Sequence, residues 1–427
     1  MPTEAERVAI REENRKRLIQ YFESGITDND GTTTLGMEVE HFIVQDDGNK
    51  PVHYHAHDGV IGVEDILEHL KTAYPEETLN SHGDLLGLAN ETGSITLEPA
   101  SQLEISIAPY SRVKDVEAAY EAFRACLDPY LHEHGCHVAS FGYHPSAKAL
   151  DLPLIPKERY NFMNAHFARI GTHGERMMRA SGSTQVSIDY HSEADAVRKL
   201  RIATAIGPII GFICDNIPVF EGKRIDVPLA RLNLWRDVDN ARCGTIPGVF
   251  DEGFGFAAYA DWLLRTPPIF ITRRAADDPD GPTLRGFPDT PAYKAYEDAP
   301  MEKRDIEHLM SMFWPDVRLK KFVEIRQADC LPAQEVYGYA ALTKGLYYSE
   351  KGLTAVEKAL GVENGQWPFD DNSIDNAIAA VRKHGAQARL HGRTLLEWAD
   401  LLFELAADTL DDEETAYLEP LRARVGR

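Results

Sequence analysis

Short segments in which acidic or amide side chains alternate with apolar ones are the feature that most constrains this chain. The first covers residues 35–44, and side chains along a strand point to opposite faces in turn. Met37 and Val39 share one face, and Glu38 and Glu40 share the other. Two carboxylates on one strand face repel each other unless a cation lies between them. This segment alone fits either a solvated strand face or a site for a divalent cation with oxygen ligands.

The same alternation recurs in four later segments, each predicted to be a strand. Their polar faces carry Thr96, Glu98, Gln102, Glu104 and Ser106 in residues 94–109; Gln185, Ser187 and Asp189 in residues 183–190; Arg231, Asn233 and Trp235 in residues 229–235; and Glu324 and Arg326 in residues 322–326. Pro99 indicates a bulge or an edge position within its strand. Five such segments predict one sheet with an apolar back, packed by helices, and a polar, concave front.

The predicted front of the sheet gathers more carboxylates than one cleft can hold as anions without counter-charge. Its acidic and amide members are Glu38, Glu40, Glu98, Glu104, Gln185 and Glu324. Mg²⁺ is the usual solution when phosphates supply the remaining ligands. Arg231 and Arg326 offer guanidinium forks for a carboxylate or a phosphate. Because phosphoryl transfer depends on positioning and on neutralised oxygens, we predict a site that uses ATP.

The other common nucleotide and catalytic motifs do not occur. The sequence has no GxxxxGK[ST] loop, and the glycines at 253 and 255 do not continue as GxGxxG. There is no GxSxG elbow and no HExxH helix. A bound nucleotide would therefore lie on a metal-lined sheet instead of a glycine-rich loop.

The rest of the chain reads mainly as helices around this sheet. Helical spacing of apolar residues covers residues 4–22, 61–73, 111–134 and 192–205, and from residue 333 to the C-terminus the chain is predicted to be helical. Residues 273–304 are rich in Asp, Pro and charge and are expected to form a surface excursion or a lid. No domain-scale linker interrupts the chain. We predict one α+β domain over residues 1–427, with a helical part at about 333–427.

Composition excludes several classes of partner. The formal net charge of −23 over 427 residues argues against a nucleic acid or an anionic membrane. Five dispersed cysteines without a CxxC pair, and a charged N-terminus without a signal-peptide pattern, predict a cytoplasmic protein. No apolar run reaches transmembrane length. The sequence makes no prediction of the oligomeric state.

In their order and spacing, several of these motifs resemble the plant-type glutamate–cysteine ligases, relatives of glutamine synthetase. The motifs are residues 36–40, 95–99, 102–104, 156–160, 185–189, 231–235, 317–320, 324–326 and 328–329. The resemblance implies a glutamine-synthetase-like fold, in which a curved antiparallel sheet backed by helices forms a funnel-shaped active site. It also implies that ATP phosphorylates the γ-carboxylate of L-glutamate and that the amine of L-cysteine then displaces phosphate, giving γ-glutamylcysteine.

The resemblance also implies roles for individual residues. Mg²⁺ or Mn²⁺ would be held by Glu38, Glu40, Glu98, Glu104, Gln185 and Glu324. Arg326 and Lys320 would contact ATP, and Arg231 with Trp235 would hold glutamate, with Tyr160 also binding substrate. Glu38, Glu324 and Arg326 would be the catalytic residues.

Two departures from the plant-type pattern bear on the amine acceptor. The plant-type enzymes usually have an arginine five residues before the strand glutamine, where this chain has Ala180, with Arg179 one residue earlier. Either Arg179 takes that role or the substrate end is built differently, so a glutamate ligase for another amine is an alternative. An inactive protein that binds glutamate or a nucleotide is a further alternative. The cysteines do not match the plant redox-switch positions.

Overall fold

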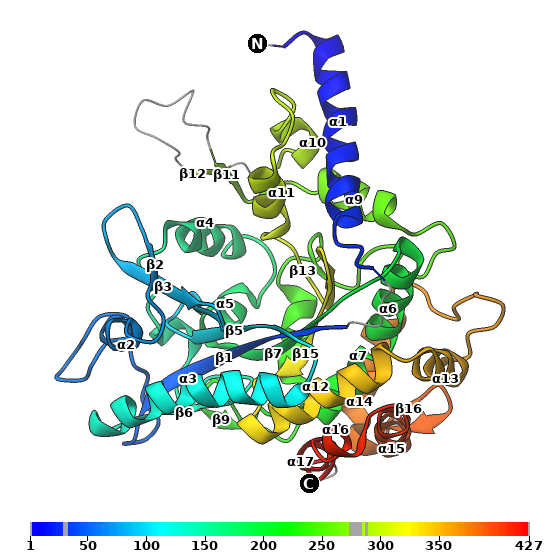
Figure 1. Ribbon diagram of the computed structural model, residues 1–427. Coiled ribbons are helices and arrows are strands. Elements are labelled where there is room, and N and C mark those ends of the chain that lie inside the picture. Colours follow the sequence, from blue (N-terminus) through cyan, green and yellow to red (C-terminus); the bar gives the residue numbers. More distant parts are fainter. Residues whose placement is uncertain (1, 29–32, 273–283, 287–288, 426–427) are drawn as a thin grey trace.

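A nine-stranded antiparallel sheet forms the centre of the molecule (Figure 1). The computed structural model describes residues 2–28, 33–272, 284–286 and 289–425, and all element counts refer to these residues. In order across the sheet, the strands are β14 (Val317–Leu319), β15 (Val323–Asp329), β7 (Ser183–Ile188), β1 (Leu35–Gln45), β5 (Leu103–Tyr110), β4 (Gly93–Leu97), β3 (Leu85–Asn90) and β2 (Glu76–Leu79), and β6 (Cys136–Ala139) pairs with the second half of β1. The predicted antiparallel sheet is confirmed.

The strand register places the polar side chains of neighbouring strands side by side. Glu38 of β1 lies opposite Gln185 of β7, and Glu40 lies opposite Glu104 of β5. On the other face, Val39 and Ile105 are opposite each other and are buried. Since side chains alternate along each strand, one register fixes both the acidic front and the apolar back.

Two long helices cover the apolar back of the sheet. In Figure 1, α3 (Val113–Glu133) and α12 (Ala333–Tyr347) run along one side of the sheet, and α4 (Glu158–Phe167) and α11 (Lys303–Met310) stand on the other. Tyr120 of α3 bonds the ring of His41 on β1 at 2.6 Å and packs edge-on against Tyr337 of α12. The back of the sheet is therefore the main hydrophobic core, and the front is left for a cavity.

The remaining helices surround these layers. They are α1 (Glu4–Glu23), α2 (Val63–Leu70), α5 (Gly174–Ala180), α6 (Glu193–Ala205), α7 (Gly207–Ile213), α8 (Ala230–Leu234), α9 (Phe256–Arg265), α10 (Ala292–Ala295), α13 (Glu350–Leu360), α14 (Ser373–His384), α15 (Leu395–Ala407), α16 (Asp412–Thr415) and α17 (Leu418–Arg422). The predicted helical C-terminal part contains one short hairpin of strands, β16 (Arg389–Leu390) and β17 (Arg393–Thr394). Among the described residues, no helix combines the length and the apolar character that crossing a membrane requires.

Two predicted strands differ in the structure. Residues 94–109 form not one strand but the hairpin β4–β5, because the chain turns at Pro99, where Glu98 N donates to Gln102 O at 2.9 Å. Residues 229–235 are not a strand. They form α8, which begins after Leu229 in a left-handed conformation (φ 57°). Residues 273–283 and 287–288 of the predicted surface excursion lie outside the described residues.

We predict that Ile105→Ala lowers the free energy of unfolding by about 2–5 kcal/mol, because it leaves a void between the central strands and the back helices. Ile105 is only 2 % exposed. As a control, Val8→Ala on α1, where the side chain is 48 % exposed, should change it by less than about 0.5 kcal/mol. Denaturant unfolding followed by circular dichroism measures both; equal effects would contradict the assignment of the core.

Candidate functional site

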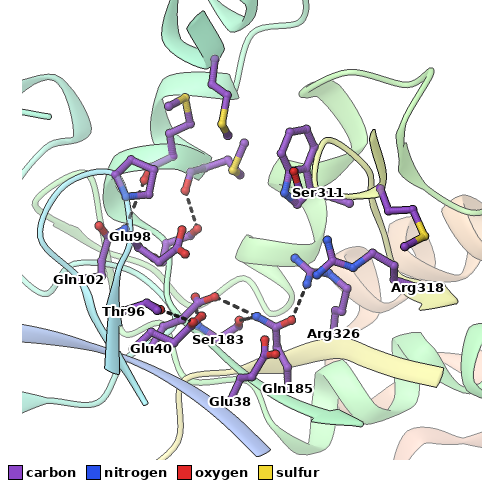
Figure 2. Close-up of a pocket in the computed structure, with 18 of the residues that line it drawn as sticks. Glu38, Glu40, Thr96, Glu98, Gln102, Ser183, Gln185, Ser311, Arg318 and Arg326 are labelled. Atoms are coloured by element: carbon purple, nitrogen blue, oxygen red, sulfur yellow. Dashed lines mark hydrogen bonds between the residues drawn. The ribbon is translucent and has the colours of Figure 1, made fainter. Parts of the chain in front are cut away.

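The polar front of the sheet forms the floor of a cavity of about 510 Å³ (Figure 2). Ten of the twelve predicted site residues line it: Glu38, Glu40, Glu98, Glu104, Tyr160, Gln185, Arg231, Trp235, Lys320 and Arg326. The other two, Arg179 and Glu324, do not. Figure 2 shows Glu38, Glu40 and Gln185 at the floor, with Glu98 on one side and Arg318 and Arg326 on the other. Acidic and basic side chains thus occupy different sides of one cavity.

Hydrogen bonds hold the acidic side of the cavity in place. Glu40 accepts from Ser183 N at 2.7 Å and from Gln185 Nε2 at 2.9 Å, and Glu104 accepts from Thr96 Oγ1 at 2.6 Å. The turn that carries Glu98 is fastened by another residue, Gln102.

Gln102 links the β4–β5 turn to the start of β7. Its Oε1 accepts from Ala100 N at 2.9 Å, and its Nε2 donates to Ser181 O at 3.1 Å. Pro99, which has no N–H, sits in this turn and also lines the cavity. The sequence placed Gln102 on the polar face, but the structure shows that it positions Glu98.

The carboxyl groups of Glu38, Glu40 and Glu104 have too few neighbouring cations to offset their burial and mutual repulsion. Burial, together with the neighbouring charges of Glu324 and Glu104, raises the pKa of Glu38 to about 7. Burial and the neighbouring Glu98 and Glu104 raise the pKa of Glu40 to about 8. Burial and Glu98 raise the pKa of Glu104 to about 6, although Thr96 opposes the shift. These groups resist ionising together, as like charges in a cleft do.

Glu324 is in the opposite situation, and its predicted metal role stays a prediction. Its carboxylate is fully buried and accepts from Arg318 Nε and Nη2 at 2.7 and 3.0 Å and from Lys320 Nζ at 2.7 Å. Arg326 Nη1 adds a bond at 2.9 Å. Burial alone would raise the pKa of Glu324, but these cations hold it well below its usual range. As placed, Glu324 anchors the cations beneath the cavity and has no oxygen facing it.

Arg231 and Trp235 reach the cavity from a helix turn instead of a strand. They are four residues apart, so α8 and the short 3-10 turn after it present both on one side. A Cβ on Gly211 of α7 would lie 2.4 Å from Leu232 Cδ1, so α8 packs closely against α7. The pattern of polar and apolar residues over residues 229–235 fits either a helix turn or a strand. Packing against α7 determines that the segment is helical.

Arg179 does not take the place suggested for it. Its guanidinium donates to Leu152 O at 3.0 Å and to Asn164 Oδ1 at 2.7 Å, outside the cavity lining. Tyr160 does line the cavity, and its hydroxyl donates to Leu97 O at 2.9 Å. The structure therefore does not bring Arg179 to the cavity, and a role for it in substrate binding stays a prediction.

Sequence reasoning gave no role to several residues that line the cavity. Lys157, Arg159 and Arg318 lay within motifs used for the resemblance and were available as candidates. Four of the eight methionines, Met163, Met177, Met178 and Met310, also line the cavity. They come from α4, α5 and α11 and follow no shared spacing, so no sequence signal would have grouped them.

Comparison with known proteins agrees with this geometry. Residues 34–427 match the family model described as glutamate-cysteine ligase family 2. The chloroplastic glutamate–cysteine ligase of Arabidopsis thaliana is 31 % identical over 420 residues, which cover 96 % of this chain and 76 % of that protein. Glutamate–cysteine ligase B of Oryza sativa subsp. japonica, also chloroplastic, is 32 % identical over 343 residues, or 80 % of this chain and 68 % of that protein. This chain belongs to the glutamate–cysteine ligase family 2.

A solved structure shares the fold of this family member. The crystal structure of a glutamate–cysteine ligase from Francisella tularensis in complex with AMP matches it with a TM-score of 0.55 at 14 % sequence identity. The match covers 92 % of this chain and 82 % of that one. At this identity the likeness concerns the fold, and it agrees with the predicted α+β class.

The donor groups at the floor have the chemistry that a hard divalent cation requires. Glu38, Glu40, Glu98 and Glu104 supply carboxylate oxygens to one cavity, and the raised pKa values of three of them report excess negative charge. Among the described residues, no three carboxylate, imidazole or thiol groups are gathered closely enough to hold a metal ion as they stand. The residues fit the cation in type, and their side chains would have to draw together around it.

We predict that, without divalent cations, the protein loses stability as the pH rises from about 5 to about 8.5. The folded-state pKa values of Glu38, Glu40 and Glu104 lie above the ordinary value of 4.5, at about 7, 8 and 6. Their protonated forms therefore stabilise the fold fully below pH 4.5, and this contribution is lost as the pH rises through those values. Glu324, with a lowered pKa, loses its contribution only in acid.

Thermal unfolding midpoints across this pH range provide the measurement. Glu38→Gln should show a smaller decrease than the unaltered protein, because the amide cannot ionise. A midpoint that rises between about pH 6 and pH 8.5 in the unaltered protein would contradict the assignment.

Proposed function

We propose that this protein joins the γ-carboxylate of L-glutamate to the amine of L-cysteine, using ATP and Mg²⁺. The observation that carries the proposal is the separation of charge in one cavity. Figure 2 shows Glu38 and Glu40 at the floor, Glu98 on one side, and Arg318 and Arg326 on the other. Glu104 and Lys320 also line this cavity. Membership of the glutamate–cysteine ligase family 2 supports the same reaction.

The reaction takes place in two balanced steps. An oxygen of the glutamate γ-carboxylate attacks the γ-phosphorus of ATP, and ADP leaves. The amine nitrogen of cysteine then attacks the carbonyl carbon of the acyl phosphate, and inorganic phosphate leaves while the amine gives up a proton. Both steps place negative charge on phosphate oxygens, so cations that are already fixed lower the barrier without moving.

The basic side of the cavity is suited to the phosphates of ATP. Arg326, Arg318 and Lys320 converge on Glu324, which holds all three at hydrogen-bond distance. One buried carboxylate under three cations leaves an excess of positive charge at the cavity wall. We assign Arg326 and Lys320 to ATP, as the sequence predicted, and add Arg318.

The acidic side is suited to Mg²⁺. Glu38, Glu40, Glu98 and Glu104 would hold it, and when bound it neutralises phosphate oxygens. Gln185 Oε1 accepts from Arg326, and its Nε2 donates to Glu40, so it joins the acidic side to the basic side. A ligand role for Gln185 or Glu324 would require each to exchange a protein partner for the ion.

Glutamate is assigned to Arg231 and Trp235. Arg231 of α8 lines the cavity, and its guanidinium suits a substrate carboxylate. Trp235 beside it offers an apolar surface for the methylene groups of glutamate. Tyr160 of α4 also lines the cavity.

A glutamate ligase for another amine is the second candidate, and one observation favours it. Arg179 points away from the cavity, and the wall formed by Met163, Met177 and Met178 is apolar and adaptable. Such a wall suits a thiol, and it also suits an alkyl amine.

The five cysteines are all free thiols, which agrees with the proposed reducing, cytoplasmic location.

The test is release of ADP from ATP with glutamate, Mg²⁺ and a panel of amines. We expect release with cysteine, and mass spectrometry should show γ-glutamylcysteine. If ADP is released only with another amine, that amine is the acceptor instead of cysteine. No release with any amine would refute the ligase proposal and favour a binding protein.

We predict that Glu38→Gln lowers kcat by at least about 100-fold while the protein stays folded, because it removes a metal ligand from the centre of the floor. The matched control is Glu91→Gln, an exposed glutamate in the β3–β4 turn, which should leave kcat unchanged. Steady-state ADP release at saturating substrates gives kcat. Full activity of Glu38→Gln would contradict the metal role of Glu38.

A further inference from the structure

A β-bulge in β15 changes which residues of this strand face the cavity side of the sheet. Ile325 pairs with Val186 and Ala328 pairs with Thr184, so two residues, Arg326 and Gln327, lie opposite Gln185 alone. A bulge of this kind reverses the alternation beyond it. Asp329, which regular alternation would turn towards the helices, instead pairs with Ser183, a residue of the cavity lining.

The carboxylate of Asp329 is fully engaged. Its Oδ1 accepts from Arg231 Nε at 2.9 Å, and its Oδ2 accepts from Asn216 N at 2.8 Å. Asp329 and Arg231 are both buried, with 4 % and 3 % of their surfaces exposed. A buried ion pair in which each carboxylate oxygen accepts a hydrogen bond holds its partner in one direction.

Arg231 makes its other bonds to the same bulge. Its Nη2 donates to Ala328 O at 2.7 Å and to Arg326 O at 3.0 Å. Nε and Nη2 are thus occupied, and among the described residues none accepts a hydrogen bond from Nη1. Because Arg231 lines the cavity, Nη1 is the group left for a ligand.

Gly142 packs closely against the carboxylate of Asp329. A Cβ on Gly142 would lie 2.3 Å from Asp329 Cγ and 2.6 Å from its Oδ2. Gly142 N donates to Asn216 O at 3.0 Å, so the backbone that packs on Asp329 is itself tied to Asn216. Any side chain at position 142 would push the carboxylate away from its present place.

We propose that Asp329 is a positioning residue, which acts through Arg231 by aiming its guanidinium at the carboxylate of the amino-acid substrate. The inference rests on the proposed role of Arg231 in binding glutamate. Asp329 does not touch the substrate. It fixes the direction of the arginine, and the bulge at Arg326–Gln327 brings it to the position from which it does so.

We predict that Asp329→Asn raises the KM and the Kd for glutamate about 10- to 100-fold, the effect of one weakened charge-assisted hydrogen bond. The KM for ATP and kcat should change by less than about threefold, because the phosphate cations are held by Glu324 instead. Initial rates give the kinetic constants, and calorimetry with Mg²⁺ and ADP present gives the glutamate Kd without turnover.

A double-mutant cycle separates positioning from a general structural role. In the Arg231→Ala background, Asp329→Asn should raise the glutamate Kd less than about twofold further, because its target is gone. An effect that is fully additive to that of Arg231→Ala, or an unchanged Kd in Asp329→Asn alone, would overturn the proposal.

Two further variants guard against simple loss of folding. Gly142→Ala keeps every charge but displaces the carboxylate, so it should raise the glutamate Kd in the same way as Asp329→Asn. Glu414→Gln removes a buried carboxylate that bonds Lys344 Nζ at 2.7 Å on the far side of the sheet, and it should lower the unfolding midpoint without changing the glutamate Kd. A normal Kd in folded Gly142→Ala would count against the proposal.

The failures of the two proposals are distinguishable. Glutamate binding without ADP release for any amine would refute the ligase proposal and leave the comparison of glutamate Kd values intact. No glutamate binding by the unaltered protein would overturn the role of Arg231 and, with it, that of Asp329.

Discussion

The unequal sharing of charge along one sheet face is the constraint on which the site depends. Glu324 has three cations at hydrogen-bond distance, whereas Glu38, Glu40 and Glu104 have too few, and their pKa values move in opposite directions for that reason. One face of the sheet thus carries a group of side chains suited to anions and another group suited to cations. A metal triphosphate needs both groups together, which is the physical reason for connecting this cavity with ATP.

The sheet sets this arrangement through register as much as through composition. Glu38 opposite Gln185 and Glu40 opposite Glu104 bring the acidic groups together, and the core behind them holds the register because a one-residue slip would bury every carboxylate. The bulge in β15 interrupts the regular register with β7, and this interruption contributes to the site. It puts Asp329 under Arg231 and frees two carbonyls for the same guanidinium.

Sequence reasoning reached the floor of the site because β1, β5, β7 and the part of β15 before its bulge alternate, so each residue's face there follows from its neighbours. It failed where the backbone left that pattern. The turn at Pro99 split one predicted strand into two, and the segment around Arg231 is a helix turn whose conformation depends on packing against Gly211. Arg231 and Trp235 still reach the cavity, because a separation of four residues suits a helix. Arg179 could not be placed from the sequence, since its partners Leu152 and Asn164 come from a distant loop and helix.

By itself, the sequence determined which side chains face front and which face back, and therefore the polar chemistry of the floor, because period-two alternation is a local property of the chain. Only the tertiary structure decided which carboxylate is neutralised, which arginine is aimed into the cavity and which turns away. Those outcomes depend on contacts between residues far apart in the chain, such as Arg231 with Asp329 and Arg326 with Gln185, and on a bulge that no alternation pattern records.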